Sequence, residues 1–476
     1  MGVSSPKPVF FHPGGYDMAT FDLMVIGSGS GGYVAALRAA QLGAAVALVE
    51  ERELGGVCLN RGCIPTKAVL ESARVLGALK RAEQFGLKSA DVEVDYPAVI
   101  ARKEKVVARL RRGLAALLKG ARVEVVGGHA KILDAHTIEV TERDSTRKIE
   151  GKNIVVATGS EPARPRVFPF DGSRVITSDD ALGLTELPES VLIVGGGYIG
   201  CEFASMWSEL GSKVTLVEML PALLPQADQD VSKEMQRVLM RKRVKVHVGT
   251  KIERMTTTPG GVTAELGEGR SVEAAIALVA VGRKLNGDLA GLKELGVQLQ
   301  GDAIGVDEFG RTNVEGVYAV GDVTGKCLLA HYASEQGVVA AEHLFGGSPE
   351  PIDERAVPSC VFTIPEIASV GLSEAEARRK LTDVRVGRFD MTALGKASAS
   401  GETTGFVKVI GDGNDTVVGV HMVGHEVTSM IAEAALAVRM KLKMNDIVHT
   451  IHAHPTMPEA FHEAALDFFA RAIHKL

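Results

Sequence analysis

Two stretches of the chain share one order of apolar, glycine-rich and helical segments. In the first, residues 21–27, FDLMVIG, form an apolar run that predicts a short buried strand. A glycine-rich turn follows, and then YVAALRAAQLG, a segment of helical composition ending at Gly43, which suits the position after a helix. A second apolar run, AAVALVE, finishes at Glu50. This order predicts a strand–helix–strand unit.

The same order returns between residues 191 and 218, in VLIVGGGYIGCEFASMWSELGSKVTLVE. In both stretches an acidic residue, Glu50 or Glu218, lies 23 positions after the first glycine of a G-x-G-x-x-G fingerprint. Glycines let the backbone approach a pyrophosphate, the helix N-terminus favours its negative charge, and the carboxylate accepts hydrogen bonds from ribose hydroxyls. Glycines that only make tight turns would not need this matching register. Two dinucleotide sites are therefore predicted, with fingerprint glycines Gly27, Gly29 and Gly32 in the first and Gly195, Gly197 and Gly200 in the second.

The surroundings of each fingerprint indicate which dinucleotide it binds. Glu218 is followed by Met219 and Leu220, with no arginine close behind to receive a 2′-phosphate, and this favours NAD over NADP. The first unit continues into GGVCLNRGCIPTK, residues 55–67, which holds two cysteines. Flavin exchanges electrons with both thiols and nicotinamide. We therefore expect FAD at the first site and NAD at the second.

Composition restricts the class of protein further. The chain has 476 residues, 46% of them hydrophobic and 24% charged, which predicts an ordinary globular protein with several domains. A net charge of −6 argues against nucleic acid as a partner. No apolar run approaches the roughly 18 residues of a membrane helix. Residues 1–20 lack the features of a secretory signal or transit peptide, so we expect a flexible extension there. Five cysteines do not make an extracellular disulfide framework, which predicts a cytoplasmic location.

Cys58 and Cys63 have four residues between them in a chain with few cysteines. They could be two unrelated buried thiols. They could belong to a metal site, which would need two further Cys or His at comparable spacing. They could also be a reversible redox pair. Pro65 suits the first turn of a helix, so Cys63 is expected near a helix N-terminus, where a thiolate is stabilised.

Further motifs lie along the rest of the chain. They are NIVVATGSEP (153–162), ALVAVGRKLN (277–286), VYAVGDVTG (317–325) and HAHPTMPE (452–459). Together with the fingerprints and the cysteine motif, they closely resemble the FAD-dependent pyridine nucleotide–disulfide oxidoreductases, from about Phe21 to the C-terminus. The motifs are most similar to those of family members that oxidise dihydrolipoamide with NAD⁺.

The resemblance implies an α/β fold with two Rossmann-like dinucleotide-binding domains and an α+β dimerisation domain. The expected parts are the extension (1–20), the first part of an FAD domain (21–160), an NAD domain (161–285), a central segment completing the FAD site (286–355) and the dimerisation domain (356–476). The enzyme should be a homodimer. No module of about 80 residues fits ahead of the FAD domain, so the lipoyl group should arrive on a partner, a lipoyl-bearing E2 or H-protein of a multienzyme complex.

By the same resemblance, Cys58 and Cys63 form a redox disulfide beside flavin. Cys58 is the interchange thiol attacked by substrate, and Cys63 is the charge-transfer thiol facing the flavin. Lys67, paired with Glu202, would neutralise reduced flavin. Alternatively, Lys67 could be a solvated lysine on the helix surface.

The resemblance also implies that His454 is the base for the substrate thiol and that Glu459 orients its ring. In family members this histidine reaches the disulfide of the other subunit. Pro458 stands where Ser is more usual, which stiffens the approach to Glu459. His452 is expected to be structural, and Tyr332 stands where Lys is common, in a segment whose contacts come from the backbone.

The remaining expected site residues contact the two cofactors, and no metal is expected. The FAD contacts are Gly27, Gly29, Gly32, Glu50, Gly56, Lys67, Ala130, Thr158, Gly159, Asp322, Leu329, Ala330 and His331. The NAD contacts are Gly195, Gly197, Gly200, Glu202, Glu218, Ile252 and Gly282. The other three cysteines, Cys201, Cys327 and Cys360, are expected to be buried or incidental thiols.

Three alternatives compete with this interpretation. A mercuric reductase should carry a vicinal cysteine pair near its C-terminus, but the last cysteine is Cys360. A glutathione reductase prefers NADPH, which needs basic residues after the second fingerprint. A non-catalytic structural subunit of a 2-oxoacid dehydrogenase complex would be colourless and inactive.

Overall fold

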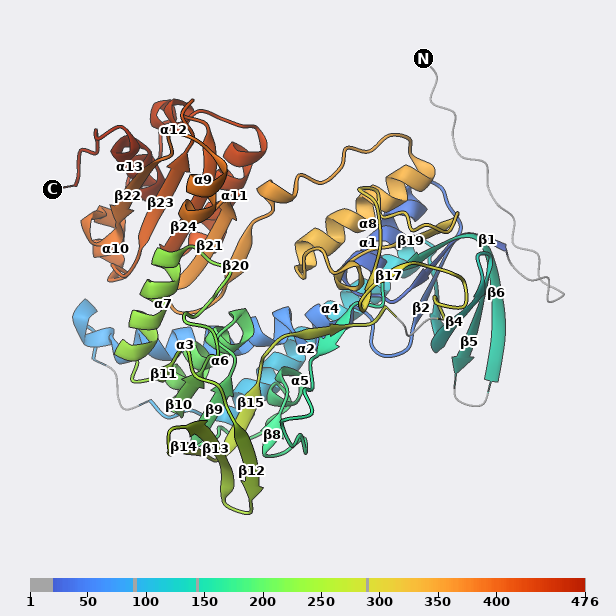
Figure 1. The fold of residues 1–476 in the computed structure, drawn as a ribbon, viewed down its shortest axis with the longest axis horizontal. Coiled ribbons are helices and arrows are strands. Elements are labelled where there is room, and N and C mark those ends of the chain that lie inside the picture. The colour runs from blue at the N-terminus through green and yellow to red at the C-terminus, as the bar shows by residue number, and fades with distance from the viewer. Residues whose placement is uncertain (1–19, 89–91, 143–144, 288–290, 476) are drawn as a thin grey trace.

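The structure is a computed structural model that describes residues 20–88, 92–142, 145–287 and 291–475. Figure 1 shows three lobes: one built on β1–β6, one on β8–β15 and a C-terminal one on β20–β24. Except for Thr20, the expected N-terminal extension lies outside the described residues. Within these ranges, no helix combines the length and the apolar content needed to cross a membrane.

The first lobe is organised around a mostly parallel sheet of order β3-β2-β1-β6-β5-β4. The long strand β6 pairs in parallel with β1 and, through its second half, with β19, whereas its first half pairs with β5 in an antiparallel meander. The strands are β1 (Thr20–Ile26), β2 (Val46–Glu50), β3 (Glu124–Gly127), β4 (His129–Asp134), β5 (Thr137–Glu142), β6 (Ser145–Val156) and β19 (Val317–Ala319).

Two helices far apart in the sequence pack against each other on this sheet. They are α1 (Ser30–Gln41) and α8 (Ala330–Phe345), which lie side by side in Figure 1. The glycines Gly31 and Gly337 allow the close approach, because a Cβ on Gly337 would collide with the Gly31 carbonyl oxygen. The crossing brings the start of α8 to the N-terminus of α1, where the first fingerprint lies.

The second lobe repeats the strand–helix–strand order. Its parallel sheet has the order β11-β10-β9-β15-β8 and carries α6 and α7, and a three-stranded antiparallel sheet, β12-β13-β14, lies beside it. Its elements are β8 (Val175–Ile176), α5 (Ser178–Ala181), β9 (Ser190–Val194), α6 (Tyr198–Leu210), β10 (Lys213–Val217), α7 (Gln229–Arg241), β11 (Lys245–His247), β12 (Arg254–Thr258), β13 (Gly261–Gly267), β14 (Arg270–Ala274) and β15 (Ile276–Val279).

The chain enters and leaves the second lobe through one two-stranded ribbon. β7 (Ser160–Pro162) pairs with β16 (Arg283–Leu285) in antiparallel register. The pairing falls at the two boundaries expected for the NAD domain. Beyond β16 the chain forms β17 (Leu299–Gln300) and β18 (Ala303–Ile304), and it then returns to the first lobe through β19, the 3-10 turn η2 (Asp322–Thr324) and α8.

The C-terminal lobe is an antiparallel sheet with helices packed on it, in keeping with the expected α+β class. Its order is β20-β21-β24-β23-β22, and Phe389, Met422 and Phe461 are among its buried residues. Its elements are η3 (Glu354–Ala356), β20 (Ser359–Val361), β21 (Glu366–Gly371), α9 (Glu374–Lys380), β22 (Arg385–Asp390), η4 (Met391–Ala393), α10 (Gly395–Ser400), β23 (Phe406–Gly411), β24 (Val417–Gly424), α11 (Val427–Arg439), α12 (Met444–His449) and α13 (Glu459–Phe468).

Candidate active site

Cys58 and Cys63 form a disulfide at the junction of two helices. Cys58 lies in α2 (Gly56–Arg61), and Cys63 is the first residue of α3 (Cys63–Lys80). Their Cα atoms are 4.6 Å apart, well within the reach of a disulfide. Because the N–H groups of the first turn of α3 have no partners within the helix, a thiolate on Cys63 is favoured there.

The disulfide lines a cavity of about 680 Å³ where the first lobe meets the other two. The walls come from the N-terminal end of α1, the end of β2, the α2–α3 junction and the start of α8. All the expected FAD contacts except Gly32 line this cavity. Gly32 instead faces β1, where an added Cβ would collide with the Gly27 carbonyl oxygen, so this glycine allows the helix to pack on the strand.

The fingerprint end of the cavity suits a dinucleotide. Oε2 of Glu50 accepts hydrogen bonds from the Ser28 amide at 2.9 Å and the Ser28 hydroxyl at 2.6 Å, and Oε1 accepts from the Arg52 amide at 2.9 Å. These bonds orient the carboxylate and leave acceptor capacity for ribose hydroxyls. A Cβ on Gly29 would meet no atom within 4 Å, so the backbone here is open to a pyrophosphate.

Asp322 belongs to a network that crosses the β7–β16 ribbon. Its Oδ2 accepts the Ser160 hydroxyl hydrogen at 2.5 Å, and the Arg283 guanidinium lies 3.8 Å away. Arg283 also donates to the Ser160 hydroxyl oxygen at 2.6 Å and the Ser160 carbonyl at 2.8 Å. Asp322 is thus held in the cavity wall by two residues to which sequence reasoning gave no role, although both lie in the quoted motifs ATGSEP and VGRKLN.

Lys67 and Glu202 make an ion pair beside the disulfide. Lys67 Nζ lies 2.9 Å from Oε1 and 2.8 Å from Oε2 of Glu202. Lys67 projects from α3, one turn after Cys63, whereas Glu202 projects from α6 of the second lobe and is 7% exposed. The pair therefore places an ammonium in the cavity at the junction of two lobes.

The second fingerprint repeats the packing of the first. A Cβ on Gly200 would collide with the Gly195 carbonyl oxygen, just as a Cβ on Gly32 would collide with the Gly27 carbonyl oxygen. The Glu218 carboxylate accepts the Gly196 amide hydrogen at 2.5 Å and that of Leu220 at 2.7 Å. These bonds hold the acidic side chain at the end of β10, beside the glycine turn.

The other expected NAD contacts are spread around this lobe. Gly197 is the residue before α6, and an added Cβ there would meet no atom within 4 Å. Gly282, at φ 137°, accepts the Ala163 amide hydrogen at 3.0 Å in the β7–β16 ribbon. The Ile252 side chain is 6% exposed and packs in the core of the second lobe. Glu202 instead lines the cavity of the disulfide.

His454 and Glu459 lie together but away from the cavity of their own chain. Nδ1 of His454 is 2.9 Å from Oε2 of Glu459, and the His454 side chain is 78% exposed. Neither residue lines the cavity of the disulfide. His452 lies nearby with its side chain only 6% exposed, and Glu433 raises its pKa through a 3.0 Å contact.

The other three cysteines differ in their exposure. Cys201 is buried, but Cys327 and Cys360 are half-buried, and Cys360 lines the same cavity as the disulfide. Cys360 lies on β20, an edge strand that reaches the junction of the lobes, and the sequence pattern does not encode that position. Desolvation, reinforced by nearby carboxylates, raises the pKa of both Cys327 and Cys360 to about 11, so they are protonated thiols at neutral pH.

Sequence reasoning also gave no role to Tyr198, Phe362 and Asp179, which line the cavity. Tyr198 follows the second glycine of the second fingerprint, and that position was the available signal. Asp179 has a pKa raised by burial, against the opposing effect of Arg61, which lies 3.4 Å away. No motif points to Phe362 or Asp179, because their place in the cavity depends on how the lobes pack.

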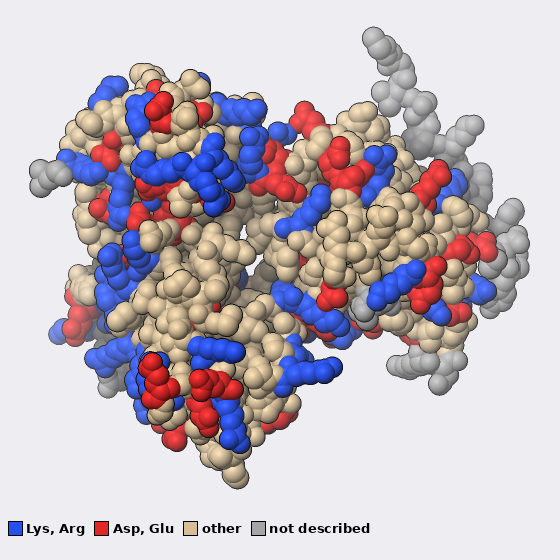
Figure 2. Space-filling view, viewed as in Figure 1, with Lys and Arg blue, Asp and Glu red and all other residues tan. Residues whose placement is uncertain are grey.

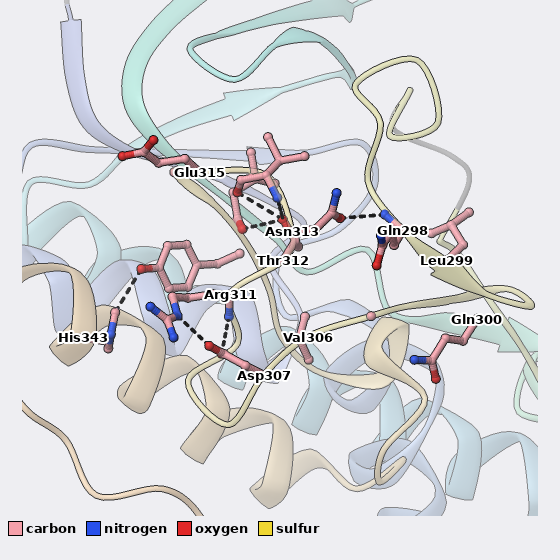
Figure 3. Close-up of a pocket in the computed structure, with 15 residues that line it drawn as sticks. Gln298, Leu299, Gln300, Val306, Asp307, Arg311, Thr312, Asn313, Glu315 and His343 are labelled. Carbon is pink, nitrogen blue, oxygen red and sulfur yellow. Dashed lines mark hydrogen bonds and ion pairs between the residues drawn. The ribbon is translucent and has the colours of Figure 1, made fainter.

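A larger hollow of about 1010 Å³ lies elsewhere on the first lobe, around β17, β18 and β19 (Figure 3). Several of its polar groups are paired with one another: Arg311 with Asp307 at 2.5 Å, Asn313 with the Gln298 backbone amide at 2.8 Å, and His343 with the Tyr318 hydroxyl at 2.9 Å. The cysteines do not line it. Size alone therefore does not select the active site, and the chemistry lies in the smaller cavity.

Charged side chains of both signs are mixed over the face shown in Figure 2. The disulfide cavity itself contains acids and bases, including Glu50, Asp179, Arg61 and Lys67. Its distinctive features are therefore the glycine turn, the disulfide and the Lys67–Glu202 pair.

Two family models match the chain. The model for pyridine nucleotide-disulphide oxidoreductases matches residues 21–337, and the model for the dimerisation domain of the same oxidoreductases matches residues 357–465. Together they span all three lobes. They confirm the family resemblance and the fold class inferred from the motifs.

Known proteins resemble the chain over nearly its full length. A dihydrolipoyl dehydrogenase of Bacillus subtilis is 41% identical, with 96% of this chain and 100% of that protein covered. One of Chlorobaculum tepidum is 43% identical, with 94% and 97% covered. Among solved structures, LpdA from Mycobacterium tuberculosis has a TM-score of 0.88 at 30% identity, with 94% of this chain and 99% of that chain covered. The HOCl-induced flavoprotein disulfide reductase RclA from Escherichia coli, as its Cu(II) complex, has a TM-score of 0.86 at 28% identity, with the same coverage.

Proposed function

The chain belongs to the pyridine nucleotide-disulphide oxidoreductase family, and from this premise we propose that it oxidises protein-bound dihydrolipoamide to lipoamide with reduction of NAD⁺. It is an FAD- and NAD-dependent dihydrolipoyl dehydrogenase. The observation that carries the proposal is the Cys58–Cys63 disulfide, which opens a helix inside a cavity built by a dinucleotide fingerprint. Such a disulfide accepts two electrons from a dithiol by thiol–disulfide exchange.

The thiol chemistry follows from the proposed roles of three side chains. His454 takes a proton from one thiol of dihydrolipoamide, and the resulting thiolate attacks Cys58 Sγ. The Cys58–Cys63 bond breaks, a mixed disulfide with Cys58 forms, and Cys63 leaves as a thiolate stabilised by the N-terminus of α3. The second substrate thiol then attacks the substrate sulfur of the mixed disulfide, while the imidazolium of His454 gives its proton to the leaving Cys58 and takes up the proton of the second thiol. Lipoamide leaves with its ring closed, and Cys58 leaves as a thiol.

FAD, when bound, would supply a two-electron acceptor for the dithiol and a hydride donor for NAD⁺. Lys67 holds a positive charge in the cavity where negative charge develops, and Glu202 fixes the position of its ammonium. Glu50 and Glu218 are proposed to accept hydrogen bonds from the ribose hydroxyls of FAD and NAD, respectively.

The domain assignment follows the lobes. We assign residues 21–160 and 286–355 to the FAD domain, 161–285 to the NAD domain and 356–476 to the dimerisation domain. The dimerisation-domain match supports a homodimer. The C-terminal lobe also exposes large apolar side chains, with Leu436 58%, Met440 62% and Ile451 96% exposed, as expected of a surface covered by a second subunit. His454, which is exposed near this region, would then reach the disulfide of the other subunit.

The partner and location belong to the same proposal. A lipoyl-bearing E2 or H-protein of a multienzyme complex would bring the dithiol to the cavity, and the enzyme would work in the cytoplasm. The test is to purify the protein, release its flavin by heat and measure dihydrolipoamide-dependent reduction of NAD⁺. We expect a yellow protein, FAD rather than FMN, and turnover. A well-folded but colourless and inactive protein that binds such a complex would favour the structural-subunit alternative.

A further inference from the structure

A short segment of the C-terminal lobe is fastened to the helix that carries Glu202. The Phe362 amide donates to Glu202 Oε1 at 2.9 Å, and the Ile364 amide donates to the Ser205 hydroxyl at 3.0 Å. Glu202 and Ser205 are three residues apart on α6 and so share one face of the helix. Alternate amides of the segment therefore bind one helix face, which fixes Phe362 relative to Glu202.

The ring of Phe362 covers the other member of the ion pair. Lys67 Nζ lies 4.4 Å from the centroid of the Phe362 ring, while the same ammonium lies 2.8 Å from Oε2 of Glu202. A cation over an aromatic face is attracted by the ring, more strongly where water is excluded. Phe362, Lys67 and Glu202 all line the cavity of the disulfide. One residue thus contacts the carboxylate through its amide and the ammonium through its ring.

We propose that Phe362 is a positioning residue, which holds the Lys67–Glu202 pair in place and thereby favours the reduced state of the flavin. The inference rests on the proposed function, in which Lys67 neutralises reduced flavin. The Lys67 side chain is 31% exposed, and without the ring more water reaches the ammonium and its side chain gains alternative rotamers, so less of its charge is directed at the flavin. A residue that only filled space between lobes would not alter the flavin equilibrium through Lys67.

The test compares the flavin reduction potential of holoenzyme variants, equilibrated with a reference dye. Phe362→Leu removes the aromatic face and keeps an apolar side chain and the amide. The flavin should become harder to reduce, and the equilibrium constant for its reduction should fall by about fivefold. For a two-electron couple this is about 20 mV, at roughly 30 mV per tenfold change. Phe362→Tyr keeps the ring and should keep the wild-type potential. If the leucine variant does not fold, Phe362→Met replaces it.

Two further variants separate this role from a packing role. Phe309→Leu is the matched control. Phe309 is also half-buried, and its ring centroid lies 5.8 Å from Cζ of Arg311, but the residue lies outside the disulfide cavity. It should leave the potential unchanged. In a Lys67→Met background, Phe362→Leu should cause no further shift.

Any of three results overturns the inference. The first is an unchanged or raised flavin potential in Phe362→Leu, and the second is a fall of the same size in Phe362→Tyr. The third is a full additional shift of the potential when Phe362→Leu is added to Lys67→Met. Failure of the proposed function itself would look different, because the wild-type protein would then bind no FAD or would not oxidise dihydrolipoamide.

Discussion

Glu459 fixes the imidazole of His454 from the first turn of a helix. Oε2 of Glu459 lies 2.9 Å from Nδ1 of His454, and Oε1 accepts the Thr456 amide hydrogen at 2.7 Å. Glu459 is the first residue of α13, so the backbone sets the direction of its carboxylate. With Nδ1 engaged, Nε2 is the ring nitrogen available to a substrate thiol on the exposed side.

The first prediction concerns this pair. Glu459→Gln keeps the size of the side chain but loses the negative charge that stabilises a protonated His454, so kcat for dihydrolipoamide should fall by about 10- to 100-fold. His454→Ala should lower kcat for dihydrolipoamide by about 10²- to 10⁴-fold. Steady-state turnover measures both, and the disulfide and flavin content should stay at wild-type levels. A Glu459→Gln enzyme with wild-type kcat would show that the carboxylate has no part in proton transfer.

The second prediction concerns nucleotide choice. Glu218 should accept from a 2′-hydroxyl and repel a 2′-phosphate, so kcat/KM should favour NAD⁺ over NADP⁺ by at least about tenfold, equivalent to 1.4 kcal/mol. Glu218→Arg should lower the ratio of kcat/KM for NAD⁺ to kcat/KM for NADP⁺. Because Glu218 also accepts from Gly196 and Leu220, the arginine variant needs a thermal-melting control. Equal use of both nucleotides by the wild-type enzyme would mean that the carboxylate does not face the ribose.

The third prediction concerns a buried ion cluster between the second and C-terminal lobes. Lys408, whose side chain is 3% exposed, lies 2.9 Å from Asp228, 2.8 Å from Asp230 and 2.7 Å from Glu374. Lys408→Met leaves Asp228 buried without its cation, so the free energy of unfolding should fall by about 3–5 kcal/mol at pH 7. Denaturant titration measures this change. A methionine variant as stable as wild type would show that the cluster contributes no net stability.

The same cluster predicts a pH dependence. Burial opposes the charged forms, but the carboxylates raise the pKa of Lys408 above its usual 10.5, and their cationic partners lower the pKa of Asp228 and Glu374. The lysine contribution is therefore complete below about pH 10.5 and is lost as the pH rises through the higher folded value. The contribution of the acids is complete above about pH 4.5 and is lost as the pH falls through their lower folded values. The stability difference between wild type and Lys408→Met should be flat from pH 6 to 9 and should shrink in strong acid.

Local patterns in the sequence were enough to predict the two nucleotide-binding units. Gly43 takes the left-handed conformation expected after a helix, with φ 92°. Glu50 ends β2 and Glu218 directly follows β10, each beside a glycine turn. These features depend on residues within one strand–helix–strand unit, where spacing determines geometry. The family resemblance added the long-range partners, because spacing alone cannot bring Lys67 to Glu202.

Other parts of the site depend on packing between lobes and left no signal in the sequence. Phe362 reaches Lys67 only because β20 docks on α6, and Cys360 enters the cavity for the same reason. The buried Lys408 would be read from sequence as a surface residue. In each case the decisive contact joins segments that no periodic pattern relates.

The fourth prediction separates the two cysteines. Cys58→Ser leaves Cys63 as a free thiolate beside oxidised flavin, so a long-wavelength charge-transfer absorbance should appear without any reductant. Cys63→Ser removes that donor and should show no such band. Both variants should lose lipoamide turnover, because the disulfide cannot form. A band in Cys63→Ser but not in Cys58→Ser would reverse the proposed roles.

The last prediction tests whether the active site is shared between subunits. The hybrid dimer joins a wild-type subunit to one carrying both Cys58→Ser and His454→Ala, with two affinity tags to isolate it. If the site is shared, the intact disulfide faces the altered histidine and the intact histidine faces the altered disulfide. Neither site works, so turnover should fall to the level of the single variants.

Sites contained within one chain predict a different result, because the wild-type subunit then keeps a complete set of residues. The hybrid would retain about half of the wild-type rate per dimer. The control is a hybrid of wild-type and Cys58→Ser subunits, which keeps one complete site under either arrangement and should show that half rate. His454 is 78% exposed and does not line its own chain's cavity. We therefore expect the control hybrid to turn over at half the wild-type rate and the double-variant hybrid to be inactive. Half activity in the double-variant hybrid would refute the shared site.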